Sequence, residues 1–310
     1  MLKDKNIYLI PCLGFLSVIL VGWILLMLPI CNNGNVTPFD ALFTAVSATC
    51  VTGLTTVNLS TDYSLWGQIA IAIITEIGAI GFVTFISFIL NFKKKKMSLS
   101  ETLLLSSALN DNHYGKLKQR LKEVIKYTMV IQIIGAILLA VDFIPRFGMK
   151  QGIWYSIFHS ITAFCNAGFD IIGNSSLEIF AKNIYVNIVF IMLMFLGSIG
   201  YFVIEDVIRC IKKKSFLHIS FHTKIVLTAS IIIYLISIIL LKIAEPNLTW
   251  LEAVFTGVTA RTTGFSTIDM SATLPITKLI ISLLMIIGGA PRFNFGRNKN
   301  YINCNFSINC

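Results

Sequence analysis

The stretch FDALFTAVSATCVTGLTT, residues 39–56, decides how the rest of this chain is interpreted. Its helical part, residues 39–48, would be about 15 Å long, whereas the hydrocarbon core of a bilayer is about 30 Å thick. The stretch is rich in small hydroxyl residues and ends in a Gly flanked by Thr, which suits a backbone that exposes its carbonyl groups. It therefore predicts a half-helix that enters a membrane and returns as a loop.

The same pattern recurs at residues 156–169 and 252–265, each time between two long apolar runs. A second similarity joins the helices that follow the first two loops, because IGAIGF at residues 77–82 resembles LGSIGY at residues 196–201. Two similarities in the same register favour an internal repeat over chance. We expect repeated units of apolar helix, half-helix with a Gly-ended loop, and apolar helix.

Composition and charge support a membrane protein. The chain is 55% hydrophobic and 13% charged, with a mean hydropathy of +0.79, which excludes a soluble globule. The net charge is +10, and sixteen of the 25 Lys and Arg lie at Lys3, at Lys5 and in segments 93–126 and 209–224. Such clusters mark cytoplasmic loops and a cytoplasmic amino terminus of a plasma-membrane protein, rather than nucleic-acid binding. The seven Cys have no spacing typical of a disulfide framework or zinc site.

The expected organisation follows the apolar runs in order. Spanning helices are predicted at residues 7–30, 63–92, 124–144, 184–208 and 225–244, and from residue 276. Half-helices are predicted at residues 39–48, 154–164 and 250–260. The predicted boundaries are 1–92 for the first repeat, 93–122 for a cytoplasmic connection, 123–211 for the second repeat, 212–224 for a cytoplasmic loop and 225–291 for an incomplete third repeat. The predicted fold class is an all-α polytopic membrane protein.

The loops have the chemistry of a cation filter. Non-helical backbone survives at membrane depth only where it is buried in protein or lines a wet cavity, and rings of carbonyl oxygens can replace the hydration shell of a passing ion. The half-helices end at the loops, so the negative ends of their dipoles favour a cation there. The candidate filter residues are Thr49, Val51, Thr52, Gly53, Asn166, Ala167, Gly168, Thr262, Thr263 and Gly264. The Thr hydroxyls, including that of Thr49, are expected to brace the loops.

Four residues are candidates for supporting the filter. Asp40 is expected to cap the first half-helix and to interact with its dipole. Cys50 and Cys165 each stand three residues before a filter Gly. Arg261 is unexpected beside a cation path, and we favour a bracing salt bridge to a carboxylate such as Asp269 or Glu252 over a direct barrier to cations. Glu76 lies inside an apolar run and is expected to face the protein interior or water, as a structural carboxyl or as part of an ion pathway.

These loops resemble the filters of the Trk/Ktr/HKT superfamily of potassium transporters. ALFTAVSATCVTGL at residues 41–54 looks like the first pore loop of that family, FCNAGF at 164–169 like the second, and RTTGF at 261–265 like the third. The bacterial Ktr-type membrane subunit is the nearest fit. The resemblance implies a pseudo-fourfold pore, of which this chain has three of four repeats. It implies potassium as the transported ion, often with sodium dependence, and no cofactor. It also implies a homodimer that sits on a cytosolic nucleotide-binding regulatory subunit.

The carboxyl end departs from that family. Gly288, Gly289 and Pro291 resemble the start of the family's gate hinge, but a polar stretch follows at 292–310. We interpret that stretch as an out-of-frame tail, and expect this chain alone to be poorly active or inactive. The alternative is a nontransporting membrane subunit, or a fragment that assembles with a partner. An enzyme using His159, Cys165 and Asp170 is disfavoured, because six helical residues place His159 and Cys165 on opposite faces.

Overall fold

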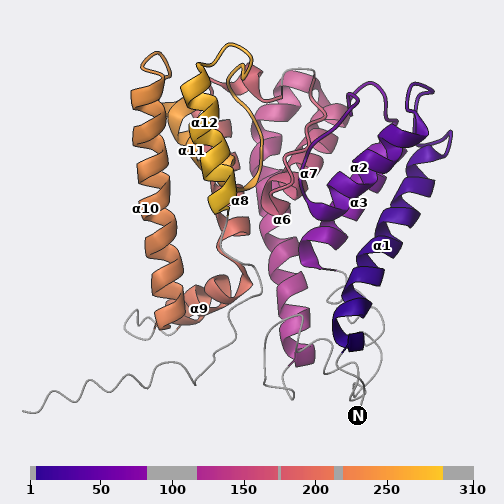
Figure 1. The fold of residues 1–310 in the computed structure, drawn as a ribbon, viewed down its shortest axis with the longest axis horizontal. Helices are drawn as coiled ribbons and strands as arrows, with labels where there is room; N and C mark the ends of the chain where they lie inside the picture. Colours follow the sequence, from indigo (N-terminus) through magenta and orange to yellow (C-terminus); the bar gives the residue numbers. More distant parts are fainter. Residues whose placement is uncertain (1–4, 82–116, 174–175, 213–218, 289–310) are drawn as a thin grey trace, which may run out of the picture.

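The computed structural model describes residues 5–81, 117–173, 176–212 and 219–288, and within these ranges it contains helices but no strand (Figure 1). The helices are α1 Lys5–Met27, α2 Pro38–Cys50, α3 Leu65–Ile80, α6 Leu117–Phe147, α7 Met149–Cys165, α8 Ile184–Ser198, α9 Tyr201–Lys212, α10 Phe221–Ala244, α11 Trp250–Thr262 and α12 Pro275–Ile287, with a short 3-10 helix η2 at Glu178–Phe180. The predicted tail at 292–310, and Gly289 and Pro291, lie outside the described residues.

The predicted repeat is confirmed by three units, α1–α2–α3, α6–α7–α8 and α10–α11–α12, each with a helix that leads into a loop at its centre. Neighbouring units touch in chain order, since α3 packs on α7 and α8 packs on α11. Figure 1 shows the starts of α1, α6 and α10 at the same end of the bundle as α9. The described basic residues Arg209, Lys212 and Lys224 belong to that end.

Local sequence explains where two of the half-helices begin. Thr37 and Asp40 form a capping box at the start of α2, and Pro38 between them occupies the first helical position. Thr249 and Glu252 form the corresponding box at the start of α11. In each box the Thr hydroxyl accepts a hydrogen bond from the backbone N–H of the acidic residue, and the carboxylate accepts one from the backbone N–H of the Thr. These bonds satisfy N–H groups that have no partner within the helix.

The span predicted at residues 184–208 is broken near its middle. The chain forms two helices, α8 and α9, that are bent by 104° at the break. Gly200 has φ +83°, a backbone conformation that a right-handed helix cannot contain. Asp206 on α9 then accepts hydrogen bonds from the Ser220 backbone and the Thr223 hydroxyl, both at 2.8 Å, which fixes α9 to the start of α10.

The lengths of the apolar helices also differ from expectation. Two described helices are long and apolar enough to cross a membrane alone, Lys122–Phe147 and Phe221–Ala244, and the bent pair could supply a third span. Two other apolar helices are shorter, at Leu65–Ile80 and Pro275–Ile287. The predicted span at 63–92 ends as a helix at Ile80, where Gly81 has φ +89°; its remainder lies outside the described residues.

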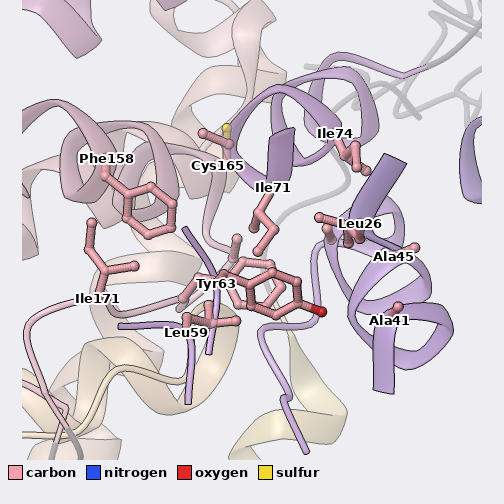
Figure 2. Packing of buried hydrophobic residues seen from close by; sticks show 14 residues of the cluster. Leu26, Ala41, Ala45, Leu59, Tyr63, Ile71, Ile74, Phe158, Cys165 and Ile171 are labelled. Atoms are coloured by element: carbon pink, nitrogen blue, oxygen red, sulfur yellow. The ribbon is translucent and has the colours of Figure 1, made fainter. Parts of the chain in front are cut away.

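Two apolar clusters join the three units. In the first, Ala41 and Ala45 of α2 pack against Leu26 of α1 and Ile71 of α3 (Figure 2). Phe158, Cys165 and Ile171 from the second unit belong to the same cluster, which therefore crosses the boundary between units. The second cluster joins α6, α7 and α8 to α11 and to Phe265 of the third loop. The three loops are thus held between packed units.

Candidate functional site

The first two loops begin with the same backbone turn. Val51 after α2 has φ 58° and ψ 44°, and Asn166 after α7 has φ 58° and ψ 40°, so both residues are left-handed. The next N–H in each loop donates back into the helix, from Thr52 to the Ser47 carbonyl at 2.9 Å and from Ala167 to the Thr162 carbonyl at 2.8 Å. Such bonds satisfy carbonyls left open at a helix end and turn the chain sharply.

The third loop starts differently. Thr262, which occupies the position of Val51 and Asn166, is the last residue of α11, and Thr263 follows with φ −116° and ψ −52°. The Gly264 N–H donates to the Thr259 carbonyl at a longer 3.3 Å. The third loop therefore leaves its helix one residue later, without a left-handed residue before the Gly.

The filter glycines bring the loops into direct backbone contact. Gly53 and Gly168 have φ +78° and +76°, and a Cβ atom on Gly53 would overlap the carbonyl oxygen of Ala167. In the same way, a Cβ atom on Gly168 would overlap the carbonyl oxygen of Thr263. Each of these glycines therefore lies against the carbonyl that precedes the next filter Gly. A Cβ on Gly264 would meet no other described heavy atom within 4 Å.

The three loops open into one cavity. Its volume is about 570 Å³, and Gly53, Gly168 and Gly264 all line it, together with Thr55 and Asp170. The half-helices α2, α7 and α11 all end at this place, so their negative dipole ends face the loops. The arrangement can offer backbone oxygens to a cation that enters from the cavity. Elsewhere in the described chain, no group of three or more His, Cys, Asp or Glu could hold a metal ion.

The predicted bracing by Thr hydroxyls holds for some residues only. The Thr263 hydroxyl donates to Asn166 Oδ1 at 2.8 Å and thereby connects the third loop to the second. The Thr52 hydroxyl donates to Ser47 Oγ at 2.9 Å and holds the first loop against α2. The Thr49 hydroxyl instead donates to the Ala45 carbonyl at 2.8 Å, so it stabilises its own helix and does not brace the loop.

Asp40 has the predicted capping role and an additional one. Its carboxylate accepts from the Thr56 hydroxyl at 2.6 Å, which fastens the chain after the first filter loop to the start of α2. Hydrogen bonds from Thr37 and Thr56 lower the pKa of Asp40 below its ordinary value. The expected helix-capping carboxylate therefore also closes the first loop.

The two candidate Cys residues have different surroundings. Cys50 is exposed, whereas Cys165 is fully buried. The Cys165 thiol donates to Glu76 Oε2 at 3.1 Å, and Gln132 Nε2 donates to the same oxygen at 2.7 Å. Glu76 therefore faces the protein interior, one of the two expected environments, and connects α3 to the end of α7.

The predicted salt bridge of Arg261 to Asp269 or Glu252 is wrong. Arg261 is buried; its Nε donates to the Gly288 carbonyl at 2.8 Å, and its guanidinium lies 4.9 Å from the centre of the Tyr234 ring. Glu252 is engaged in the capping box of α11, and Asp269 accepts from the backbone and hydroxyl of Ser271. Arg261 therefore braces the third loop against the carboxyl end of α12.

The sequence reasoning missed one pair near the second loop. His159 and Asp170 contact each other, with 2.7 Å between Nε2 and Oδ1, although Cys165 takes no part. Helical phase relates His159 to Cys165 but says nothing about Asp170, which lies beyond the end of α7. The signal that could have found the pair is the Gly168 turn, after which the chain runs back along α7 and brings residues eleven apart together.

Comparisons with known proteins agree with this geometry. Residues 15–296 match the TrkH family model, described as a cation transport protein. The chain is 38% identical over 288 residues to the potassium/sodium uptake protein NtpJ of Enterococcus hirae, covering 89% of this chain and 63% of that protein. It is 35% identical over 287 residues to the Ktr system potassium uptake protein B of Bacillus subtilis, covering 89% of this chain and 64% of that protein. The chain thus spans less than two thirds of these relatives.

A solved structure shares the fold. The crystal structure of the potassium transporter TrkH from Vibrio parahaemolyticus superposes with a TM-score of 0.69, covering 93% of this chain and 57% of that chain. The two sequences are 16% identical. The likeness therefore supports the arrangement of helices and loops described above.

Proposed function

Because this chain belongs to the TrkH family of cation transport proteins, we propose that it forms the pore region of a potassium-uptake protein. Potassium would pass through the three loops, where backbone carbonyls replace water molecules of its hydration shell. No chemical reaction is involved, and no cofactor is required.

The observation that carries this proposal is the contact between successive loops. Gly53 lies against the Ala167 carbonyl and Gly168 against the Thr263 carbonyl, beneath a cavity shared by all three glycines. Several weak backbone sites side by side allow a cation to bind and to leave again. The proposed filter residues remain those named from the sequence, except that Thr49 acts on its own helix.

Potassium is the favoured ion because all three loops carry Gly at the filter position, as the resemblance implies. Sodium enters the proposal as a competing or coupled ion, and the name of the Enterococcus relative includes both cations. The proposed setting is the plasma membrane, with the amino terminus and the basic end of the bundle in the cytoplasm. The proposed assembly is a homodimer on a cytosolic nucleotide-binding subunit, and the Bacillus relative is named as one protein of a Ktr system.

Cation binding by the purified full chain tests the filter. We would measure thermal unfolding in detergent at constant ionic strength, with potassium, sodium or N-methylglucamine as the cation. A bound ion stabilises the folded state by about 2.7 kcal/mol at one hundred times its dissociation constant. We expect potassium to raise the melting temperature more than sodium does, and Gly168→Ala to abolish the difference. Equal melting temperatures in all three cations would reject a potassium filter in this chain.

Flux measurements separate a transporter from the nontransporting alternative. The purified chain would be reconstituted in liposomes, and rubidium or potassium entry would be followed with and without sodium. Potassium-selective entry that Gly168→Ala removes supports transport, whereas potassium binding without entry supports a nontransporting subunit. Binding is the primary measurement because we expect this chain alone to be poorly active in transport.

A further inference from the structure

His159 and Asp170 form a buried contact between the half-helix of the second repeat and the loop that follows its filter Gly. His159 lies on α7 and is fully buried, and the Asp170 side chain is 9% exposed. The distance between His159 Nε2 and Asp170 Oδ1 is 2.7 Å. Asp170 Oδ1 also accepts from the Ile172 backbone N–H at 3.1 Å. One carboxylate oxygen thus connects α7 to the returning chain.

The hydrogen bonds of His159 determine how the pair is held together. Nδ1 lies 2.7 Å from the Tyr155 carbonyl oxygen, which can only accept, so Nδ1 carries a hydrogen. The contact between Nε2 and Oδ1 then requires one further proton, located on either atom. The pair has zero net charge in both cases, as an imidazolium with a carboxylate or as an imidazole with a carboxylic acid.

The surroundings leave each partner dependent on the other. The rings of Phe143, Phe158, Phe190 and Phe265 lie within 6.2 Å of the His159 ring, measured between centroids, and none of them offers a conventional hydrogen bond. Among the described residues, the second carboxylate oxygen of Asp170, Oδ2, is buried without a hydrogen-bond partner. Breaking the contact would therefore leave His159 Nε2 buried without a partner and Asp170 with the Ile172 N–H as its one remaining bond among those described above.

The contact belongs to the second loop alone. His159 stands nine residues before Gly168 and Asp170 two residues after it. The corresponding residues are Thr44 and Thr55 in the first repeat, and Phe255 and Ser266 in the third. Neither of these pairs can form a charge-assisted bond. The second loop is also the middle one, which contacts both neighbours through Ala167 and Gly168.

We infer that His159 and Asp170 are positioning residues that clamp the second loop to α7 and so fix the direction of the Ala167 and Gly168 carbonyls. Asp170 follows Gly168 by two residues, so a shift of its carboxylate moves the peptide groups between them. The Gly53–Ala167 and Gly168–Thr263 contacts leave no room for such a shift. This positioning role rests on the proposed function, because it treats these carbonyls as cation ligands.

Hydrogen exchange of the purified full chain tests the clamp without depending on ion binding. We would measure exchange of the backbone amides at residues 169–172 in His159→Leu, Asp170→Leu and the double variant. The matched variant His159→Gln keeps an N–H that can donate to Asp170. Glu178→Gln in η2 serves as the control for losing a carboxylate from the same region of the chain.

We expect each Leu variant to raise exchange at these amides at least tenfold. The double variant should be no faster than the faster single variant, because the two residues act as a pair. His159→Gln and Glu178→Gln should stay within about threefold of the unchanged chain. Exchange within twofold of the unchanged chain in both single Leu variants, or multiplicative effects in the double variant, would overturn the clamp. The double variant leaves no unpaired partner, so it remains informative if His159→Leu does not fold.

A second readout separates a positioning role from simple support of the fold. The extra stabilisation by potassium over sodium should fall at least threefold in His159→Leu and persist in His159→Gln. An unchanged potassium preference in folded His159→Leu would overturn the positioning role. Absence of any preference in the unchanged chain would reject the proposed filter, and hydrogen exchange would still decide whether the clamp exists.

Discussion

The first two loops and the third loop reach the same cavity by different means. Val51 and Asn166 turn the first two loops with a left-handed residue and hydrogen bonds back into the helix. The third loop has no left-handed residue before its Gly, and its bond back into the helix, from Gly264 to Thr259, is longer at 3.3 Å. Side chains add anchors there, through Thr263 to Asn166 and Arg261 to Gly288. A repeated Gly therefore does not require a repeated backbone. The first two loops combine a left-handed turn with side-chain contacts, whereas the third loop depends on its side-chain contacts more heavily.

The largest expected effect is a difference in potassium affinity among Ala variants of the three filter glycines. Gly53→Ala and Gly168→Ala would place a Cβ on a neighbouring carbonyl at a positive φ, so we expect each to lower potassium affinity at least tenfold in the thermal titration. Gly264→Ala meets the same positive φ but no described neighbour within 4 Å, and we expect a loss of about threefold or less. Equal losses at all three positions would remove the distinction between the loops.

Arg261→Met tests the side-chain anchor of the third loop. The change removes a buried hydrogen bond and a cation–π contact, so we expect a loss of about 2–3 kcal/mol in stability. Arg146→Met is the matched control. Its guanidinium also lies near an aromatic ring, 5.5 Å from the centre of Phe180, but is 48% exposed in its ion pair with Asp142. Exposed pairs contribute about 0–1 kcal/mol, and thermal unfolding should show the smaller loss.

Thr263→Val tests the connection between the third loop and the second. It removes the hydrogen bond to Asn166 Oδ1, and we expect a loss of about 1 kcal/mol and faster exchange of the Gly264 amide. Thr49→Val is the comparison, because that hydroxyl bonds only within α2 and should leave exchange in all three loops unchanged. Faster loop exchange in Thr49→Val would restore the bracing role first assigned to it.

The smallest expected effect is a change in how stability depends on pH below about pH 4. Hydrogen bonds from Thr37 and Thr56 lower the pKa of Asp40, so its contribution to stability is present above the unfolded-state pKa of about 4 and is lost as the pH falls through the folded-state value. Asp269, after the third loop, has a pKa lowered by Ser271. Asp40→Asn should remove part of the stability decline below about pH 4 and speed exchange at Thr56. Asp269→Asn should also change the decline of stability at low pH, but it should leave hydrogen exchange in the first loop unchanged.

The half-helices and the filter glycines could be predicted because hydropathy and Gly placement are local properties of the sequence. The break between α8 and α9 could not, because Gly200 lies in an apolar run and Gly is common in membrane helices. The partner of Arg261 was missed for a different reason. A nearby carboxylate is the obvious choice from sequence, but Glu252 is already committed to a helix cap and a carbonyl of α12 is closer in space. Contacts between separate helices depend on packing that one chain segment does not encode alone.

The loop-to-loop contacts of Gly53 and Gly168 also determine when during synthesis the site can be completed. A ribosome delivers the amino-terminal repeat first, when the carbonyl of Ala167 that lies against Gly53 does not yet exist. The first loop can meet the Ala167 carbonyl only after the second is made, and the second can meet the Thr263 carbonyl only after the third is made. The contacts of the site are therefore completed one loop at a time, each when the following repeat arrives.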